Sequence, residues 1–296
     1  MKEIFFITKQ GSKIRRKDNQ IVVYLNDEKI TGIPISRIES MFIFGNIEIS
    51  TPAVNFLLSR NVDIFLLNLS GRLKGVITPI YLRSNNNFRI KQYKAYLNEK
   101  KNLEVSKFFV KKKLMEIQKF INKDLSEYLI RIDLLTSYNE LLGIEGALTQ
   151  KFFDYFRDFL SDKSLGFNGR NYNPPQDPVN SLLSLSYTLI YSLLFPVVVS
   201  KGLDPYLGFL HKKRGTHAAF VSDVMEIFRV DITKFVGILF NKNLIVLEDF
   251  NTDINSFRLK EKSLRKFLKI FNENYIESDI FKQNVGKIIK ELEEIL

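Results

Sequence analysis

A glycine-flanked glutamate is the first residue in the chain whose surroundings suit chemistry. In SYNELLGIEGALTQKFFDYF, a helical register places Glu145 on a face of leucines and phenylalanine. A carboxylate on an apolar stripe is costly unless it is paired, protonated or bound to a cation. Gly143 and Gly146 flank it, and glycine inside a helix is easier to understand where another element or a ligand approaches closely. A structural Glu145, paired with a nearby Arg or Lys, is the alternative.

A second segment, GLDPYLGFLHKKRGTHAAFVSDVMEIFRV, contains both histidines of the chain, His211 and His217. Asp223 and Glu226 follow three residues apart at the start of a predicted helix, so both carboxylates project from one face. Each residue also has a structural interpretation. A histidine is often satisfied in a core or lies at the surface, Asp223 suits a helix N-terminus, and Glu226 is spaced to pair with Arg229.

Together these side chains form a ligand set for a hard divalent cation. Carboxylate oxygens with one imidazole suit Mg²⁺ or Mn²⁺, which could neutralise charge on a phosphodiester or activate an attacking oxygen. The chain has no Cys, which excludes disulfides, thiolate metal sites and cysteine nucleophiles. Spacing alone makes the set only moderately specific, because carboxylate triads arise by chance in most helical proteins.

The overall charge indicates a polyanionic partner. The 296 residues include 44 Lys and Arg against 33 Asp and Glu, a formal net charge of +11, which attracts nucleic acid or an anionic membrane surface. We expect Arg83, Arg89 and a lysine-rich helix to touch phosphates, although a solvated helix face explains the lysines as well. The lysines of that helix are Lys100, Lys101, Lys107, Lys111, Lys112, Lys113, Lys119 and Lys123. No secretory signal is evident, so we expect a cytoplasmic protein.

The sequence pattern changes near residue 85 from short strands to long helices, and these elements must position the candidate residues. Short apolar runs up to about Leu82 predict strands, interrupted by one helix over 51–60 with Thr51 as N-cap and Pro52 at its first position. An Asn-rich linker is expected over 83–93. Long helical patterns follow over 95–129, 134–160, 179–200 and 218–228, with several more to the C-terminus. The predicted class is α+β, with a β-rich, β-sandwich-like domain (1–84) and a larger all-α domain (85–296).

One uncharged segment, residues 178–200, is long enough to cross a bilayer. Its serines and threonine, Pro196 near its end and its polar flanks favour a buried helix instead. We therefore expect no membrane partner, and a peripheral membrane protein built on this segment is a minor alternative. Pro174, Pro175 and Pro178 stiffen the loop that leads into this segment, and Asp177 or Asn180 can cap the helix. Arg170 in this loop could contact phosphate, although a plain interdomain loop explains it nearly as well.

Four ordered motifs resemble the CRISPR-associated integrase family often called Cas-one, over essentially the whole chain. They are GIEG at 143–146, RNYNPPQDPVNSLLS from Arg170, GLDPYLGFLH ending at His211, and DVMEIFR from Asp223. The resemblance implies a β-rich domain that dimerises and a helical catalytic domain. It carries the metal ligands onto Glu145, His211 and Glu226, with Asp223 as an accessory acidic residue. The chain departs from the family where Val230 replaces the usual Pro, and His217 has no assigned role.

By this resemblance, the reaction is a metal-assisted transesterification in which the 3′-hydroxyl of a spacer precursor attacks a phosphodiester at a CRISPR repeat boundary. Mg²⁺ or Mn²⁺ is the implied cofactor. The implied partners are spacer and repeat DNA, a second copy of the chain and the adaptation protein called Cas-two. The expected DNA contacts are Arg83, Arg89, Arg170, Tyr187, Lys212, Lys213 and Arg214. A non-catalytic DNA-binding scaffold is the competing hypothesis, and it predicts that DNA binding survives loss of Glu145, His211 or Glu226.

Overall fold

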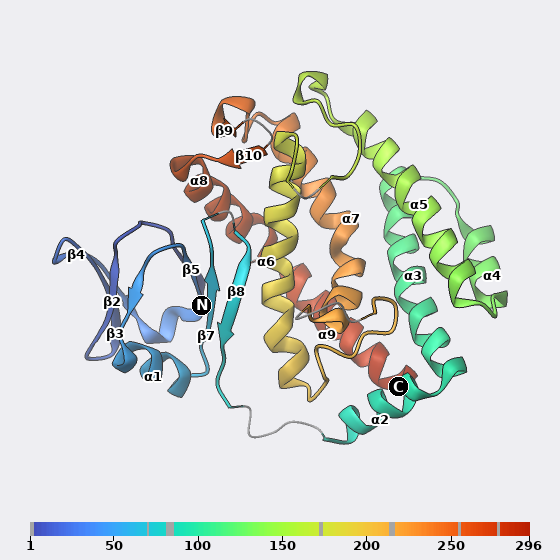
Figure 1. The fold of residues 1–296 in the computed structure, drawn as a ribbon, viewed down its shortest axis with the longest axis horizontal. Helices are drawn as coiled ribbons and strands as arrows, with labels where there is room; N and C mark the ends of the chain where they lie inside the picture. Colours follow the sequence, from blue (N-terminus) through green and yellow to red (C-terminus); the bar gives the residue numbers. More distant parts are fainter. Residues whose placement is uncertain are drawn as a thin grey trace. The chain divides into compact units, whose positions relative to one another are not determined.

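The chain forms two compact units in the computed structural model, which describes residues 3–69, 71–80, 86–171, 174–212, 217–253, 256–276 and 279–296 (Figure 1). One unit takes in Met1–Leu82 with Glu261–Phe281, and the other Arg83–Lys260 with Lys282–Leu296. The first unit thus includes a late segment that the sequence places in the helical part. The domain ranges 1–84 and 85–296 stay a prediction, since compactness does not test which parts fold on their own.

The first unit is built on two sheets. One has the order β1-β5-β7-β8, formed by Glu3–Ile7, Ile38–Phe44, Asp63–Leu67 and Leu73–Ile77. The other has the order β4-β3-β2-β6, formed by Glu28–Pro34, Gln20–Leu25, Lys13–Lys17 and Glu48–Ile49. A single apolar core draws Ile43 and Ile64 from the first sheet and Ile14 and Ile21 from the second. Alternating apolar residues of both sheets are thus buried together. The strand-rich N-terminal region is followed by helices, which confirms the predicted α+β class.

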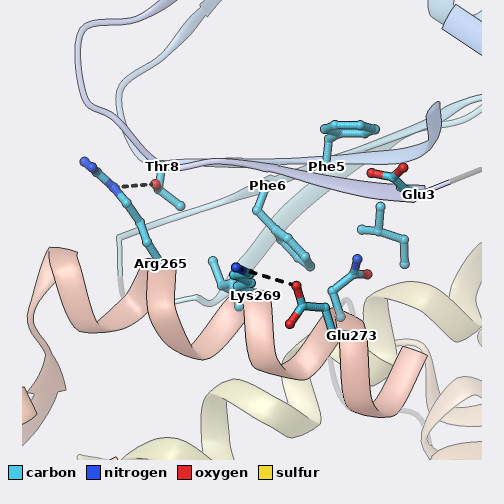
Figure 2. A pocket seen from close by; sticks show the side chains of 10 residues that line it. Glu3, Phe5, Phe6, Thr8, Arg265, Lys269 and Glu273 are labelled. Carbon is cyan, nitrogen blue, oxygen red and sulfur yellow. Dashed lines mark hydrogen bonds and ion pairs between the residues drawn. The ribbon is translucent and has the colours of Figure 1, made fainter. Parts of the chain in front are cut away.

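Among the described residues, two α-helices lie wholly in this unit. The helix α1 (Thr51–Ser59) is capped by Ser50, whose side chain accepts the backbone N–H of Ala53, so the predicted cap at Thr51 is one residue late. The helix α8 (Glu261–Phe271), extended by a helical turn over Asn272–Ile276, borders a pocket of about 540 Å³ beside β1 (Figure 2). Arg265 of α8 donates to Thr8 at 3.2 Å across one end of that pocket.

The second unit is mainly helical among the described residues. Its helices are α2 (Asn86–Leu97), α3 (Glu99–Ile121), α4 (Ser126–Leu134), α5 (Tyr138–Phe159), α6 (Pro178–Ser200), α7 (Ala219–Asn241) and most of α9 (Asp279–Ile295). It also contains a hairpin of β9 (Phe250–Asp253) and β10 (Ser256–Leu259), a short addition to the helical domain that the sequence predicts. The helix α7 also runs well past the predicted end at residue 228.

Two asparagines divide the long helix predicted over 95–129. The Asn98 side chain accepts the backbone N–H of Lys101 and caps α3, and Asn122 ends α3 in a left-handed conformation at φ 52°. The linker predicted over 83–93 is wrong from Asn86 onward, where α2 begins. Its polar composition concealed a helix that buries Phe88 and Gln92.

The apolar helix α6 lies in the core of this unit, packed against α7. It is the one helix, among the described residues, long and apolar enough to cross a membrane by length and composition, and 61% of its most apolar window is buried. Its hydroxyls bond carbonyls one turn back, as where Ser186 Oγ donates to Leu182 O at 2.7 Å. The burial and these bonds agree with the predicted core helix.

Candidate active site

Asp223 ties the loop that carries His211 to helix α7. Its carboxylate is fully buried and accepts the backbone N–H groups of Phe209 at 2.6 Å, Leu210 at 3.1 Å and His211 at 2.8 Å. The same carboxylate lies 2.8 Å from Nδ1 of His211. Because an ionised carboxylate only accepts, Nδ1 carries the hydrogen and Nε2 is left facing Glu226, whose Oε1 is 3.5 Å away. Asp223 therefore orients the imidazole.

The charges around this pair shift both pKa values. Burial raises the pKa of Asp223, while its hydrogen bonds with His211 and with the backbone act in the opposite direction. Burial alone would lower the pKa of His211, but the hydrogen bond and charge of Asp223, with the charge of Glu226, raise it. A cation that binds Nε2 must therefore displace a proton more often than it would at an ordinary histidine.

Gly208 allows the His211 loop to lie against α7. A Cβ at this position would stand 2.5 Å from the carbonyl oxygen of His211 and 2.8 Å from the backbone carbon of Ala219. Backbone atoms cannot move aside as a flexible side chain can, so the close approach requires glycine. Tyr138 of α5 holds the same loop by donating its hydroxyl to the carbonyl of Leu210.

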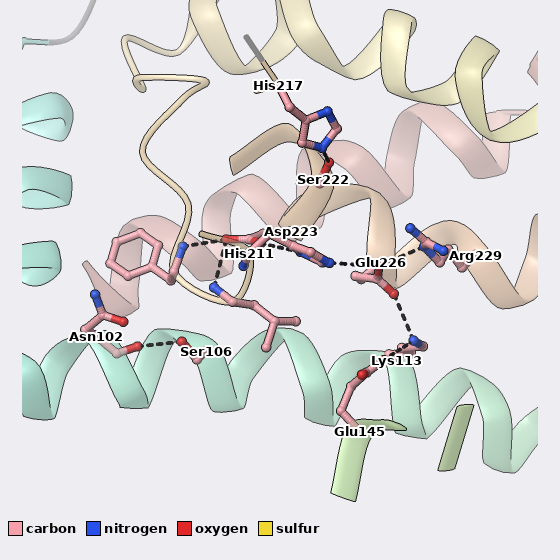
Figure 3. Close-up of polar contacts among 12 residues, drawn as sticks. Asn102, Ser106, Lys113, Glu145, His211, His217, Ser222, Asp223, Glu226 and Arg229 are labelled. Carbon is pink, nitrogen blue, oxygen red and sulfur yellow. Dashed lines mark hydrogen bonds and ion pairs between the residues drawn. The ribbon is translucent and has the colours of Figure 1, made fainter. Parts of the chain in front are cut away.

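Lys113 of α3 lies between Glu145 of α5 and Glu226 of α7 (Figure 3). Its Nζ donates to Glu145 Oε1 and is 2.9 Å from Glu226 Oε2. The side chains of Lys113 and Glu226 are only 5% and 4% exposed, whereas that of Glu145 is 22% exposed. Thr149, one turn after Glu145, also donates to its Oε1 at 2.8 Å. Three helices thus bring two carboxylates onto one ammonium.

Glu226 remains ionised because two cations flank it. Burial would raise its pKa, but the charges of Arg229 and Lys113 outweigh burial and lower that pKa to about 2. Arg229 Nε is 2.7 Å from Glu226 Oε1, so the structural pairing considered from the sequence is present. The pairing and a ligand role are compatible, since a carboxylate has two oxygens. Burial likewise opposes the charge of Lys113, yet Glu226 and Glu145 raise its pKa.

The predicted ligands have donor atoms that suit a divalent cation, but Lys113 would have to move before an ion could bind them. In the described part of the chain, no three His, Asp or Glu side chains are spaced to hold a metal as they stand. The predicted ligands Glu145, His211 and Glu226 nevertheless converge, and two of them already share a cation, Lys113. Oxygen and imidazole donors match the preference of Mg²⁺ and Mn²⁺, so the residues fit the ion if Lys113 yields its place.

The surface beside Glu145 is open. A Cβ added at Gly143 or Gly146 would meet no atom of the described residues within 4 Å, and both glycines are exposed. The expectation that another element of the chain packs on them is therefore wrong, while approach by a ligand remains compatible with the open face.

Two of the predicted DNA contacts, Arg170 and Tyr187, make contacts within the chain. Arg170 donates to Asn180 Oδ1 at 2.8 Å and to Ser184 Oγ at 2.9 Å, which fastens the preceding loop to α6. Tyr187 is 6% exposed and its hydroxyl is 2.6 Å from Thr233, so its ring is not available for a base to stack on. The guanidinium of Arg170 packs 5.4 Å from the centre of that ring.

The other predicted DNA contacts differ in accessibility. Arg89 is partly buried and donates to the carbonyl of Gly202 at 2.9 Å. Lys212 is exposed and lies over the ring of Tyr138 at 5.2 Å. Arg83, Lys213 and Arg214 lie outside the described residues.

The lysines of α3 do not form one basic face. Several of them pair with acids, namely Lys101 with Glu104, Lys111 with Asp133, Lys112 with Glu291 and Lys119 with Glu116. Sequence reasoning placed Lys113 in this basic run and missed its burial. The spacing of Lys113 in the sequence could have indicated its burial, because it shares an apolar helix face with Phe109 and Ile117, four residues away on either side.

His217 forms a separate contact. Its Nε2 is 2.5 Å from Ser222 Oγ, and its ring stacks on Tyr191 with centroids 5.3 Å apart. Burial lowers its pKa, which favours the neutral ring. In Figure 3 the ring lies apart from the contacts of His211 with Asp223 and Glu226.

Comparison with solved structures confirms the fold. A CAS1 protein from Thermotoga maritima superposes with a TM-score of 0.85 at 20% identity, over 99% of this chain and 96% of that one. A casposase bound to integration product matches with a TM-score of 0.80 at 23% identity, over 92% of this chain and 82% of that one. The chain of a Cas6-RT-Cas1–Cas2 complex matches with a TM-score of 0.79 at 20% identity, over 99% of this chain and 34% of that one.

Sequence comparison gives the family. The CRISPR-associated endonuclease Cas1 1 of Thermodesulfovibrio yellowstonii is 30% identical over 290 residues, which cover 90% of this chain and 90% of that protein. The profile of the family described as CRISPR associated protein Cas1 matches residues 5–273, a stretch that includes all of the candidate site. The chain belongs to the CRISPR associated protein Cas1 family.

Proposed function

We propose that the chain is a metal-dependent DNA endonuclease and integrase that inserts spacer DNA into a CRISPR array. The reaction is a transesterification in which a 3′-hydroxyl attacks a phosphodiester of the repeat. The observation that carries this proposal is that Glu145 and Glu226 share one buried cation, Lys113, while Nε2 of His211 lies 3.5 Å from Glu226 Oε1. The family of the chain includes relatives named endonucleases.

The ligands proposed for Mg²⁺ or Mn²⁺ are Glu145, His211 and Glu226. When bound, the ion supplies charge for the attacking and leaving oxygens of the phosphodiester. The residues around the proposed metal have different parts. Glu226 remains ionised through Arg229. Asp223 fixes the ring of His211 so that Nε2 is the free donor atom. Glu145 lies on the more exposed side, next to the open glycine face.

The proposed partners are DNA, a second copy of the chain and Cas2. Support comes from similar proteins: the casposase was solved with its integration product and the Cas6-RT-Cas1 chain in a complex with Cas2. The net charge of +11 suits a polyanionic substrate. A cytoplasmic location belongs to the same proposal.

A strand-joining assay tests this function. Purified protein with its Cas2 partner is incubated with a short 3′-hydroxyl duplex and a supercoiled plasmid carrying the repeat, with Mn²⁺ or with EDTA. Joining is expected only with Mn²⁺, and it is lost in Glu145→Ala and His211→Ala. Glu140→Ala, an exposed carboxylate on the same helix as Glu145, serves as the control and retains joining. Tight DNA binding without joining by the wild type would instead support a non-catalytic scaffold.

A further inference from the structure

Lys113 places a buried ammonium at the centre of the candidate site. Its side chain is 5% exposed and reaches from α3 toward α5 and α7. The ammonium contacts Glu145 Oε1 and lies 2.9 Å from Glu226 Oε2, as the dashed lines of Figure 3 trace. A cation bound by both carboxylates must use these oxygens or crowd this ammonium. Lys113 and a divalent cation therefore compete for one place.

The charges of the cluster make that competition strong. With His211 neutral, the cluster holds three carboxylates, of Glu145, Asp223 and Glu226, and two cationic side chains, Lys113 and Arg229, which leaves one net negative charge. A divalent cation added to all of these would leave a net positive charge in a buried place. The cluster becomes neutral if the ammonium of Lys113 withdraws, and burial of unbalanced charge is costly.

Lys113 is better suited to withdraw than Arg229. Arg229 binds the other oxygen of Glu226, Oε1, from the same helix, three residues away. Lys113 comes from a different helix on a flexible four-carbon side chain that carries a single point charge. Without a cation between them, the carboxylates of Glu145 and Glu226 would repel each other.

We propose that Lys113 is a resident cation that holds Glu145 and Glu226 together and gives up its place to Mg²⁺ or Mn²⁺. Lys113 thereby sets the affinity of the site for metal. It is a positioning residue, acting through the carboxylates. This inference rests on the proposed function, because it uses the same metal ligands.

Mn²⁺ binding measured by electron paramagnetic resonance tests the inference. Lys113→Met removes the charge and keeps an unbranched apolar side chain, and we expect it to lower the Kd for Mn²⁺ at least tenfold. Lys112→Met is the control, since Lys112 directly precedes Lys113 on α3 but pairs with Glu291. Its Kd should match that of the wild type. An unchanged or higher Kd in folded Lys113→Met would overturn the inference.

Thermal unfolding separates this role from a merely structural one. Lys113→Met is expected to melt at a lower temperature than the wild type in EDTA, and saturating Mn²⁺ should close most of that gap. If Lys113 only fills space, Lys113→Met should lower the melting temperature equally in EDTA and in Mn²⁺. That result would overturn the role of Lys113 as a resident cation.

Lys113→Arg keeps the inference testable if Lys113→Met does not fold. Arginine retains the charge and binds carboxylates through a planar fork that withdraws less readily, so the Kd for Mn²⁺ should rise. An unchanged or lower Kd in this variant overturns the inference.

The same data distinguish the two proposals. If the wild type binds Mn²⁺ and joins DNA but the Lys113 variants do not shift the Kd as stated, only the inference about Lys113 fails. If the wild type binds no Mn²⁺ and joins DNA in EDTA, the metal site itself is wrong and both proposals fail.

Discussion

The carboxylate of Asp223 lies 2.8 Å from Nδ1 of His211 and binds the backbone of the loop that carries this histidine. One buried side chain thus sets both the ring orientation and the position of the loop on α7. Groups that orient a metal-binding histidine typically change metal affinity 10–100-fold when they are replaced. Asp223 therefore supports the proposed site through the ring of His211.

Asp223→Asn tests this orienting role. Its amide cannot accept from both the ring and the loop N–H groups, so we expect the Kd for Mn²⁺ to rise about 10–100-fold. Titration of the folded variant with Mn²⁺, followed by electron paramagnetic resonance, provides the measurement. Asp231→Asn is the matched control on the same helix, and burial raises the pKa of Asp231. Equal affinities of the Asp223 and Asp231 variants would refute the orienting role.

Gly208→Ala is expected to destabilise the protein. The added Cβ would meet the backbone of His211 and Ala219, and a change of about 1 kcal/mol corresponds to about 2–4 °C in Tm for a domain of this size. We expect a decrease of at least that size, measured by thermal unfolding. Gly143→Ala is the control, because its Cβ enters open space in a helix and should raise Tm. A Gly208→Ala variant that is as stable as the wild type would show that the loop can move aside.

Lys212 is the accessible predicted DNA contact next to His211. Lys212→Gln should reduce the slope of log K against log salt for DNA binding by about 1, because each neutralised phosphate contributes about 0.9. Lys119→Gln is the comparison, since that exposed lysine pairs with Glu116 on its own helix. Its slope should equal that of the wild type. Binding isotherms at several salt concentrations measure both, and an unchanged slope for Lys212→Gln would exclude a phosphate contact.

Arg170→Ala should affect stability and leave the salt slope unchanged. Removal of the guanidinium takes one donor from Ser184 Oγ and one from Asn180 Oδ1, which still accepts the backbone N–H of Asn171. A hydrogen bond to a charged group contributes about 1.5–3 kcal/mol. Urea unfolding should therefore show a lower free energy of unfolding. A normal unfolding curve with a reduced salt slope would restore the original expectation that Arg170 binds phosphate.

The sequence predicted those parts of the molecule that local pattern controls. Strand and helix types and the buried α6 follow from periodicity and composition. Motif resemblance pointed to Glu145, His211 and Glu226, whose role as metal ligands stays a prediction. Breaks at Asn98 and Asn122 were missed, because the apolar pattern continues through both residues. Capping and left-handed asparagine, rather than loss of periodicity, end these helices.

Long-range pairings could not be read from the sequence. The spacing of Lys113 on an apolar face indicates its burial, but its pairing with Glu145 and Glu226 depends on the packing of three helices. Asp223 resembled an ordinary helix N-terminal charge, since its partners come from a loop that precedes it by twelve residues or more. Tyr187 was expected to contact DNA, yet α7 covers it through Thr233.

The most direct test of the account is the position of the metal. A crystal of the protein grown with Mn²⁺ would be measured at the manganese absorption edge, and the anomalous difference map would locate the ion. The account predicts a peak coordinated by Glu145, His211 Nε2 and Glu226, with the ammonium of Lys113 withdrawn from both carboxylates. A peak held by other residues, or Lys113 still bridging Glu145 and Glu226 in a protein that joins DNA with Mn²⁺, would contradict it.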